Sequence, residues 1–140
     1  MSNLQAFMIE EKEEIFEYVA SKRFKDDNGK PMTWKLKSIN AKENDQLKKE
    51  CYKQVLVSNG NKKAYQQQLD TIKYLELLVD KCVVFPDLHS AELLDFYNEM
   101  NSIDLLKKHL LNAAEYDDLV AEVQKINGYD LVEASEEAKN

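Results

Sequence analysis

The stretch SKRFKDDNGKPMTWKLKSIN, residues 21–40, decides how the first part of the chain folds. Its second half alternates like a strand with one buried face, and three apolar side chains share that face: Met32, Trp34 and Leu36. Residues 14–21 mix β-branched and aromatic side chains, which favour a preceding strand. Between the two runs, Asn28-Gly29 accepts the positive φ of a tight turn. The sequence therefore predicts a β-hairpin in which Trp34 is buried and structural.

Helical patterns fill most of the chain after this hairpin. Five polar residues stand where helix N-caps are needed: Asn40, Asp70, Ser90, Ser102 and Asn112. The helix patterns include residues 41–55, with one apolar stripe, and residues 71–85, with a broader one. Residues 58–68 are polar, so we interpret them as a loop or as the tip of a second hairpin. The predicted fold class is α+β, mostly α, with an N-terminal β-hairpin followed by a compact bundle of about five helices.

The length of the chain, 140 residues, suits one domain with a core of its own. The sequence contains no internal repeat and no linker long enough to separate two domains. We predict a flexible leader over residues 1–13, a single domain over residues 14–129, and an acidic, disordered tail over residues 130–140.

The sequence also indicates a compartment. The N-terminal residues carry acids where a secretion signal would carry bases, and no run of about 18 apolar residues follows. Cys51 and Cys82 have no Cys-x-x-Cys partner, so we expect reduced thiols rather than a disulfide. These features predict a cytoplasmic protein that does not contact a membrane.

Residue types that carry catalysis are sparse. His89 and His109 lack the spacing of a metal site, and Cys51 and Cys82 fall on apolar helical stripes, where thiols are not activated. Each glycine is explained by a turn or a helix cap, which leaves no phosphate-binding loop: Gly29, Gly60 and Gly128. We therefore predict no catalytic, metal-binding or cofactor-binding residues, and a protein that is not an enzyme.

Charge is unevenly distributed along the chain. Residues 22–63 carry twelve Lys and Arg against five Asp and Glu, whereas residues 71–140 carry six against fifteen. Such a layout can attract an oppositely charged partner or let copies of the protein meet head to tail. A small nucleic-acid-binding or regulatory protein that uses the basic 22–63 segment is the alternative function. Nucleic acid is disfavoured, because the alternation places Trp34 on the face opposite Lys35 and Lys37.

The order of these motifs resembles the tail assembly chaperones of phages of Gram-positive bacteria and of defective prophage-like elements. The resemblance covers about residues 15–130. Four pieces carry it, in this order: SKRFKDDNGKPMTWKLKSI, ENDQLKKEC, LDTIKYLELLVDKCVVFPDLHSAELLDFYN and LLKKHLLNAAEYDDLVAEVQKINGY.

The resemblance implies a non-enzymatic assembly factor without cofactors in the cytoplasm of the bacterial host. It would bind the tape measure protein, keep this long helical chain soluble, help recruit tail tube subunits, and be absent from the mature virion. Chaperones of this kind also have a longer, frameshifted form. Ala138-Lys139-Asn140 can be encoded by a heptamer on which the ribosome slips, so the chain can have such a longer form. The added C-terminal module of that form would bind the major tail tube protein.

Surplus apolar positions on the predicted helices give the candidate partner-binding residues. These residues flank the main stripes of their helices, and they are Leu77, Val84, Leu105 and Leu111. We expect each to lie against another helix of the bundle, a second copy of the chain or the tape measure protein.

Overall fold

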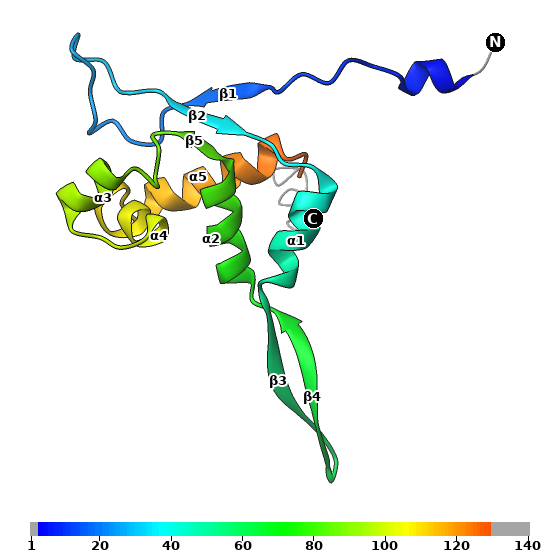
Figure 1. Cartoon of the computed structure of the whole chain (residues 1–140). Coiled ribbons are helices and arrows are strands. Elements are labelled where there is room, and N and C mark those ends of the chain that lie inside the picture. The colour runs from blue at the N-terminus through cyan, green and yellow to red at the C-terminus, as the bar shows by residue number, and fades with distance from the viewer. Residues whose placement is uncertain (1–2, 130–140) are drawn as a thin grey trace, which may run out of the picture.

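The computed structural model describes residues 3–129 of the chain. Within this range it contains five β-strands in two separate sheets and a set of mostly short helices. Figure 1 shows the helices below a small sheet, a long hairpin that projects from the body, and an N-terminal segment that runs away from the sheet.

The larger sheet has three antiparallel strands in the order β1-β2-β5. Strands β1 (Ile15–Tyr18) and β2 (Trp34–Lys37) form the predicted N-terminal hairpin, with Tyr18 opposite Trp34. Gly29 in the connecting loop has φ +81°, the left-handed conformation for which glycine is suited. The predicted hairpin is therefore confirmed.

Most of the predicted helix starts are confirmed. The longer helices are α1 (Ala41–Lys49), α2 (Thr71–Cys82) and α5 (Ala113–Ile126), and the shorter ones are α3 (Ala91–Tyr97), α4 (Ser102–Leu105) and a π-helical turn, η2 (Leu106–Leu110). Asn40 and Asn112 each form a reciprocal capping box, with Glu43 and Glu115 respectively. Asp70 and Ser90 also cap their helices, whereas α4 is capped by Asn101 rather than by Ser102.

The hydrophobic core lies between the three-stranded sheet and the helices. Trp34 is 2% exposed and Leu36 is fully buried, so the predicted burial is confirmed for these two residues, whereas Met32 is partly buried and precedes β2. From the helices, the core receives fully or almost fully buried side chains, among them Leu78, Val79, Cys82, Leu105, Leu106, Leu119 and Val123. Helix α5 therefore completes a core that the N-terminal hairpin begins.

The prediction of a helix bundle after the hairpin is wrong. Strand β5 (Val83–Phe85) joins the sheet beside β2, so the predicted helix 71–85 ends three residues early. β-branched Val83 and Val84 disfavour a helix, and Phe85 precedes Pro86, which also disfavours the helical conformation. The molecule is an α+β domain in which short helices cover a sheet.

The second correction concerns residues 52–69. Strands β3 (Tyr52–Asn59) and β4 (Lys62–Leu69) form a two-stranded antiparallel hairpin. The predicted helix 41–55 ends at Lys49, because the residues after Cys51 are β-formers closed by a tight turn. Gly60 has φ +67°, as the first central residue of a type II′ turn requires. Of the two interpretations of residues 58–68, the hairpin tip is correct and the loop is wrong.

The predicted leader, residues 1–13, is described from residue 3. It contains a short 3-10 helix, η1 (Asn3–Phe7), followed by an extended, exposed run that leads into β1. We call residues 3–14 the N-terminal arm. The predicted acidic tail, residues 130–140, lies outside the described residues. Within residues 3–129, no helix has the length and apolar character needed to cross a membrane.

Candidate functional site

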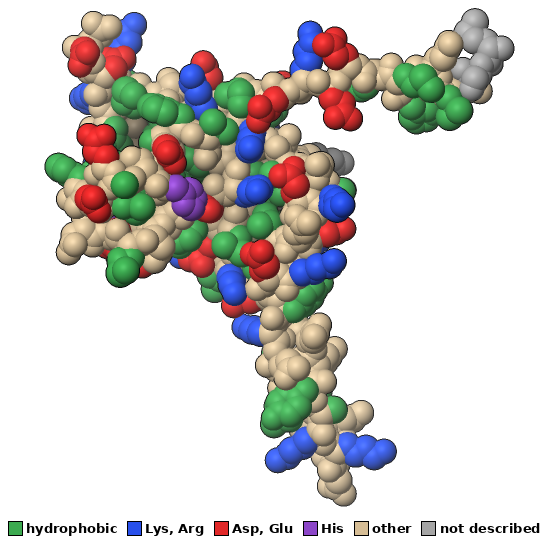
Figure 2. All heavy atoms as spheres, in the orientation of Figure 1, with side chains coloured by type: hydrophobic (Ala, Val, Ile, Leu, Met, Phe, Trp, Pro, Cys, Tyr) green, Lys and Arg blue, Asp and Glu red, His purple; other side chains and the backbone are tan. Residues whose placement is uncertain are grey.

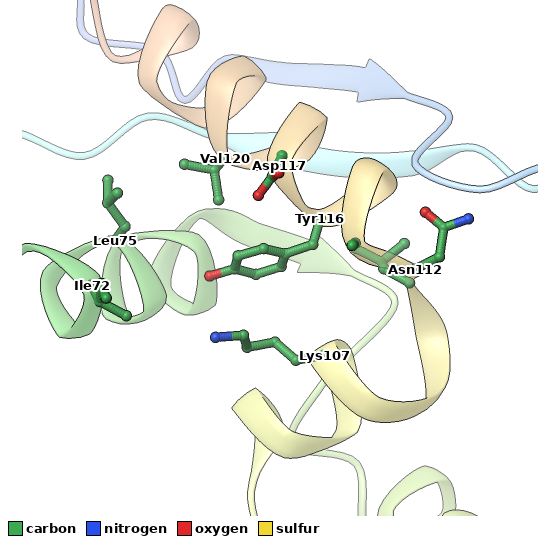
Figure 3. Close-up of a pocket in the computed structure, with 9 residues that line it drawn as sticks. Ile72, Leu75, Lys107, Asn112, Tyr116, Asp117 and Val120 are labelled. Carbon is green, nitrogen blue, oxygen red and sulfur yellow. The ribbon is translucent and has the colours of Figure 1, made fainter.

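A groove with a volume of about 540 Å³ lies between α2, η2 and α5, and we call it the α2–α5 groove. It is lined by Ile72, Leu75, Lys107, Leu111, Asn112, Ala113, Tyr116, Asp117 and Val120. Figure 3 shows Ile72 and Leu75 on α2, Tyr116 and Val120 on α5, and the Tyr116 ring directed toward α2. The lining is mostly apolar and includes two charged side chains, Lys107 and Asp117.

Local sequence explains where the groove opens. Asp70 caps α2, so Ile72 lies in the first turn of this helix, and its side chain is 71% exposed. Asn112 caps α5 on the facing side, which places Ala113 at the first helical position and Tyr116 one turn further. Residues from the first turns of both helices therefore line the groove.

Lys107 forms one wall of the groove and is held in place by two partners. Its Nζ atom lies 2.8 Å from Oε2 of Glu76 and 5.0 Å from the centre of the Tyr116 ring. The hydrogen bond to Glu76 raises the pKa of Lys107, and burial raises the pKa of Tyr116. Lys107 is therefore charged and Tyr116 neutral at physiological pH, and both have defined positions before any partner binds.

The shape and chemistry of the groove suit an amphipathic helix. Such a ligand presents apolar side chains at i, i+3 and i+4, which would cover the exposed Ile72 and the partly buried Leu75 and Val120. Lys107 and Asp117 would face the polar flanks of the ligand helix. The lining of the groove contains no Ser, Thr, Cys or His side chain.

The four predicted partner-binding residues separate into different environments. Leu105 is fully buried and Leu111 is 4% exposed, so both belong to the core of the chain itself, although Leu111 also lines the floor of the groove. Leu77 is partly buried and packs against the core. Val84 is 41% exposed on β5, far along the chain from the groove residues of α5. The structure does not bring the four together into one surface.

Sequence reasoning missed Ile72 and the exposed side of Tyr116. Tyr116 and Val120 share the apolar stripe of the last helix in the sequence, and both are partly buried in the structure. The sequence signal for the groove was Ile72, because it is an apolar residue in the first turn of a helix whose other side already supplies the core. Only the relative positions of α2 and α5 distinguish a groove from a continuous core.

The cysteines that were considered for catalysis are buried, and the histidines that were considered for metal binding each lie beside a carboxylate. Cys51 and Cys82 are free, buried thiols, and burial raises the pKa of each, which disfavours the reactive thiolate. The Nε2 atom of His89 lies 2.9 Å from Asp80 Oδ1, and that of His109 lies 2.8 Å from Glu99 Oε1. Among residues 3–129, no group of three or more His, Cys, Asp or Glu side chains is placed to hold a metal ion.

The basic 22–63 segment is spread over the β1–β2 loop, β2, α1 and the β3–β4 hairpin. Trp34 is buried, so its ring offers no platform on which a base could stack. Arg23 donates two hydrogen bonds, to the carbonyl oxygens of His109 (2.9 Å) and Leu110 (2.8 Å). The single arginine of the chain therefore connects the β1–β2 loop to the end of η2, which is a structural role.

The comparisons with known proteins identify the family of the chain. The model of the phage XkdN-like tail assembly chaperone family matches residues 4–139. The chain therefore belongs to this family of phage tail assembly chaperones, and the resemblance found in the sequence is confirmed.

Relatives and a solved structure support this membership. The chain is 30% identical over 122 residues to the phage-like element PBSX protein XkdN of Bacillus subtilis (strain 168), a match that covers 86% of this chain and 80% of XkdN. It is 28% identical over 132 residues to the uncharacterised protein YqbN of the same strain, covering 93% and 86%. The crystal structure of YqbN is similar with a TM-score of 0.74 and 25% identity, covering 93% of this chain and 99% of YqbN.

Proposed function

We propose that this tail assembly chaperone acts in the bacterial cytoplasm by binding the tape measure protein and keeping it soluble until the tail tube is built around it. The observation that carries the proposal is the open, apolar α2–α5 groove on a chain of this family. A long helical protein with unpartnered apolar stripes aggregates on its own, and a chaperone lowers this risk by covering the stripes. The protein acts by binding and not by catalysis, and is released before the virion matures.

The test is coexpression with the tape measure protein encoded by the same phage or prophage. Two variants block the groove in different ways: Ile72→Glu places a charge in its apolar lining, and Ala113→Trp adds a bulky ring to the same lining. Both positions are exposed, so neither substitution disturbs the core. We expect each to reduce the soluble tape measure protein at least several-fold and to abolish its copurification with the chaperone.

Matched controls lie outside the groove. Met100 is 95% exposed and Phe96 is 78% exposed, and neither lines the groove. Met100→Glu and Phe96→Glu therefore introduce the same charge without touching the proposed site, and both should leave copurification unchanged. Full copurification with Ile72→Glu and Ala113→Trp would refute the groove as the binding site.

Val84 gives the proposal a second contact to test. Of the four candidates taken from the sequence, it has the most exposed side chain, at 41%. Val84→Glu adds a charge at the outer strand of the three-stranded sheet. Loss of tape measure protein binding in this variant would extend the binding surface from the groove to the sheet, and unchanged binding would restrict it to the groove.

Recruitment of tail tube subunits is the second half of the proposed function. We propose that it uses a longer form of the chain made by slippage at the codons of residues 138–140, which lie outside the described residues. The codons themselves test the first step, because a sequence that breaks the A AAA AAC heptamer ends the idea at this position. Mass spectrometry of a lysate should then detect a minor species that shares residues 1–140 and has additional C-terminal mass.

A further inference from the structure

The described part of the chain ends at a pocket, which we call the α1–α5 pocket. It has a volume of about 230 Å³ and is lined by residues around the start of α1, by Leu78 of α2, and by Asn127 and Tyr129 after α5. Leu78 is almost fully buried, so the pocket has an apolar part. An apolar cavity of about 150 Å³ holds a benzene molecule, and the α1–α5 pocket therefore has room for one leucine side chain.

The end of α5 has a fixed position beside this pocket. Gly128 has φ +97°, and its N–H group donates a hydrogen bond to the carbonyl oxygen of Lys125 at 3.0 Å. The N–H group of Tyr129 donates to the carbonyl oxygen of Gln124, also at 3.0 Å. These two bonds form a Schellman motif, which ends a helix with a defined chain direction. Because Tyr129 itself lines the pocket, the chain after it starts at the pocket.

The α1 side of the pocket offers hydrogen-bond donors. The side-chain oxygen of Asn40 accepts a hydrogen bond from the Glu43 amide at 2.8 Å, and that of Asn44 accepts one from the Tyr74 hydroxyl. Within residues 3–129, the side-chain NH2 group of neither asparagine donates a hydrogen bond. The pocket therefore suits a segment that brings one apolar side chain together with acceptor oxygens.

The C-terminal segment, residues 130–140, has this composition and lies outside the described residues. Its two large apolar residues, Leu131 and Val132, come first, and acidic residues surround and follow them: Asp130, Glu133, Glu136 and Glu137. Leu131 is two residues from Tyr129, at most about 7 Å along the chain, so its side chain can reach the pocket. The family model matches as far as residue 139, so the similarity to the tail assembly chaperones includes this segment.

Charge also favours contact between the C-terminal segment and the α1 side of the molecule. The segment carries four acidic residues and one lysine. Residues 41–63, which include α1 and most of the β3–β4 hairpin, carry six lysines and three acidic residues. Figure 2 shows basic side chains on α1 and along the hairpin, and no acidic side chain on the visible face of the hairpin. The segment and this surface therefore have opposite net charge.

The geometry of α1 indicates which lysine the segment meets first. Ala41 and Asn44 line the pocket, and Lys48 lies on the same side of the helix, because positions i, i+3 and i+7 share one face. Lys48 is about 6 Å further along the helix axis than Asn44. Glu133 is two residues beyond Leu131, at most about 7 Å along the chain, so its carboxylate reaches Lys48 when Leu131 is in the pocket.

We propose that the C-terminal segment docks along α1 of its own chain, with Leu131 in the α1–α5 pocket and Glu133 paired with Lys48. The sequence alone predicted a disordered tail, and the pocket provides a binding site for it. Docking covers the apolar part of the pocket and supplies acceptors to Asn40 and Asn44. It also directs the chain end away from α5 and toward the base of the β3–β4 hairpin.

Hydrogen exchange measured by mass spectrometry tests the docking. The comparison is the exchange of residues 130–137 in the intact chain against a free peptide of residues 127–140 with the same sequence. We expect exchange in the wild-type chain to be about tenfold slower, because the docked segment must open before it exchanges. Leu131→Asp and Lys48→Glu should each bring the rate close to that of the matching peptide.

A charge exchange separates the proposed ion pair from a general effect of charge. Glu133→Lys alone should lose the protection, and Glu133→Lys combined with Lys48→Glu should recover it. Lys30→Glu makes the same change in net charge as Lys48→Glu at an exposed position of the β1–β2 loop, and it should leave the protection unchanged.

Four results would overturn the proposal. The first is a wild-type segment that exchanges as fast as the free peptide. The second is protection that persists in Leu131→Asp, and the third is a double variant that is no better than the single ones. The fourth is protection that increases with protein concentration, which would assign the segment in the pocket to another copy. The assay contains neither the tape measure protein nor a longer form of the chain, so its result is independent of the function proposed above.

Discussion

The two antiparallel hairpins of this chain have opposite surroundings. In the β1–β2 hairpin, Trp34 and Leu36 are buried beneath helices, and β5 pairs with the second strand. In the β3–β4 hairpin, both strands are twice as long, yet almost every side chain is exposed. The first hairpin is part of the core, whereas the second is an appendage. Length and hydrogen bonding therefore do not determine how much a hairpin contributes to the stability of this domain.

Trp34→Ala gives the largest expected difference between the hairpins. Removing a buried indole loses its transfer free energy and leaves a cavity, so we expect the free energy of unfolding to fall by about 3–5 kcal/mol. Tyr65→Ala is the matched change in the other hairpin and should alter it by less than about 0.5 kcal/mol, as exposed substitutions do. Chemical denaturation of both variants measures the difference, and equal losses would contradict the distinction between core and appendage.

Asn112→Ala tests how far the core depends on its last helix. The Asn112 side chain accepts a hydrogen bond from the Glu115 amide at 2.8 Å, and its loss should lower the free energy of unfolding by about 1 kcal/mol. Asn112→Ser keeps a capping oxygen and should recover most of this loss. Thermal or denaturant unfolding distinguishes the two variants. If Ser were no better than Ala, the capping box would have no part in holding α5 on the sheet.

Glu115 predicts a small dependence of stability on pH. The hydrogen bond from the Asn112 backbone amide lowers the pKa of Glu115 below its ordinary value of 4.5. A lowered pKa in the folded state stabilises the fold above pH 4.5, and this contribution is lost as the pH falls through the folded value. The free energy of unfolding of the wild type minus that of Glu115→Gln should therefore be larger at pH 7 than at pH 3. A difference that does not change with pH would contradict the assignment.

Gly60→Ala should produce a purely local effect. An alanine at φ +67° is strained by about 1 kcal/mol, and nothing lies within 4 Å of the added methyl group. We expect several-fold faster amide exchange in β3 and β4 with no change in global unfolding, because the hairpin opens separately from the core. Asn61→Ala is the control at the neighbouring turn position. A fall in global stability for Gly60→Ala would show that the hairpin and the core unfold together.

The same contrast explains which features the sequence could predict. A helix N-cap contacts only residues a few positions away in the sequence, so capping roles were predictable. They are confirmed for Asn40, Asp70, Ser90 and Asn112. Cys51 was also placed correctly as a buried residue. The prediction for Val55 was wrong. It continues the helical spacing of Leu47 and Cys51 but lies in β3, because its β-forming neighbours and the turn at Gly60 determine the conformation.

The candidate site was less predictable than the fold. The apolar surplus of the helices was visible in the sequence, but the sequence left open whether Leu105 and Leu111 contact another helix or a partner, and the structure places both in the core. Whether a flanking leucine is covered depends on where η2 and α5 pack, which no local pattern specifies. Ile72 became recognisable only when α5 was seen opposite it across the groove (Figure 3).

Helix α5 has a consequence for synthesis on the ribosome. It supplies Leu119 and Val123 to the core, and the Asn127 side chain after it accepts a hydrogen bond from the Ile39 amide at 2.9 Å. The N-terminal hairpin is thus made first but receives its cover from residues translated about ninety positions later. During that interval Trp34 and Leu36 belong to an unfinished chain that cannot bury them against α5. The chaperone is itself a nascent chain with exposed apolar surface until α5 leaves the ribosome.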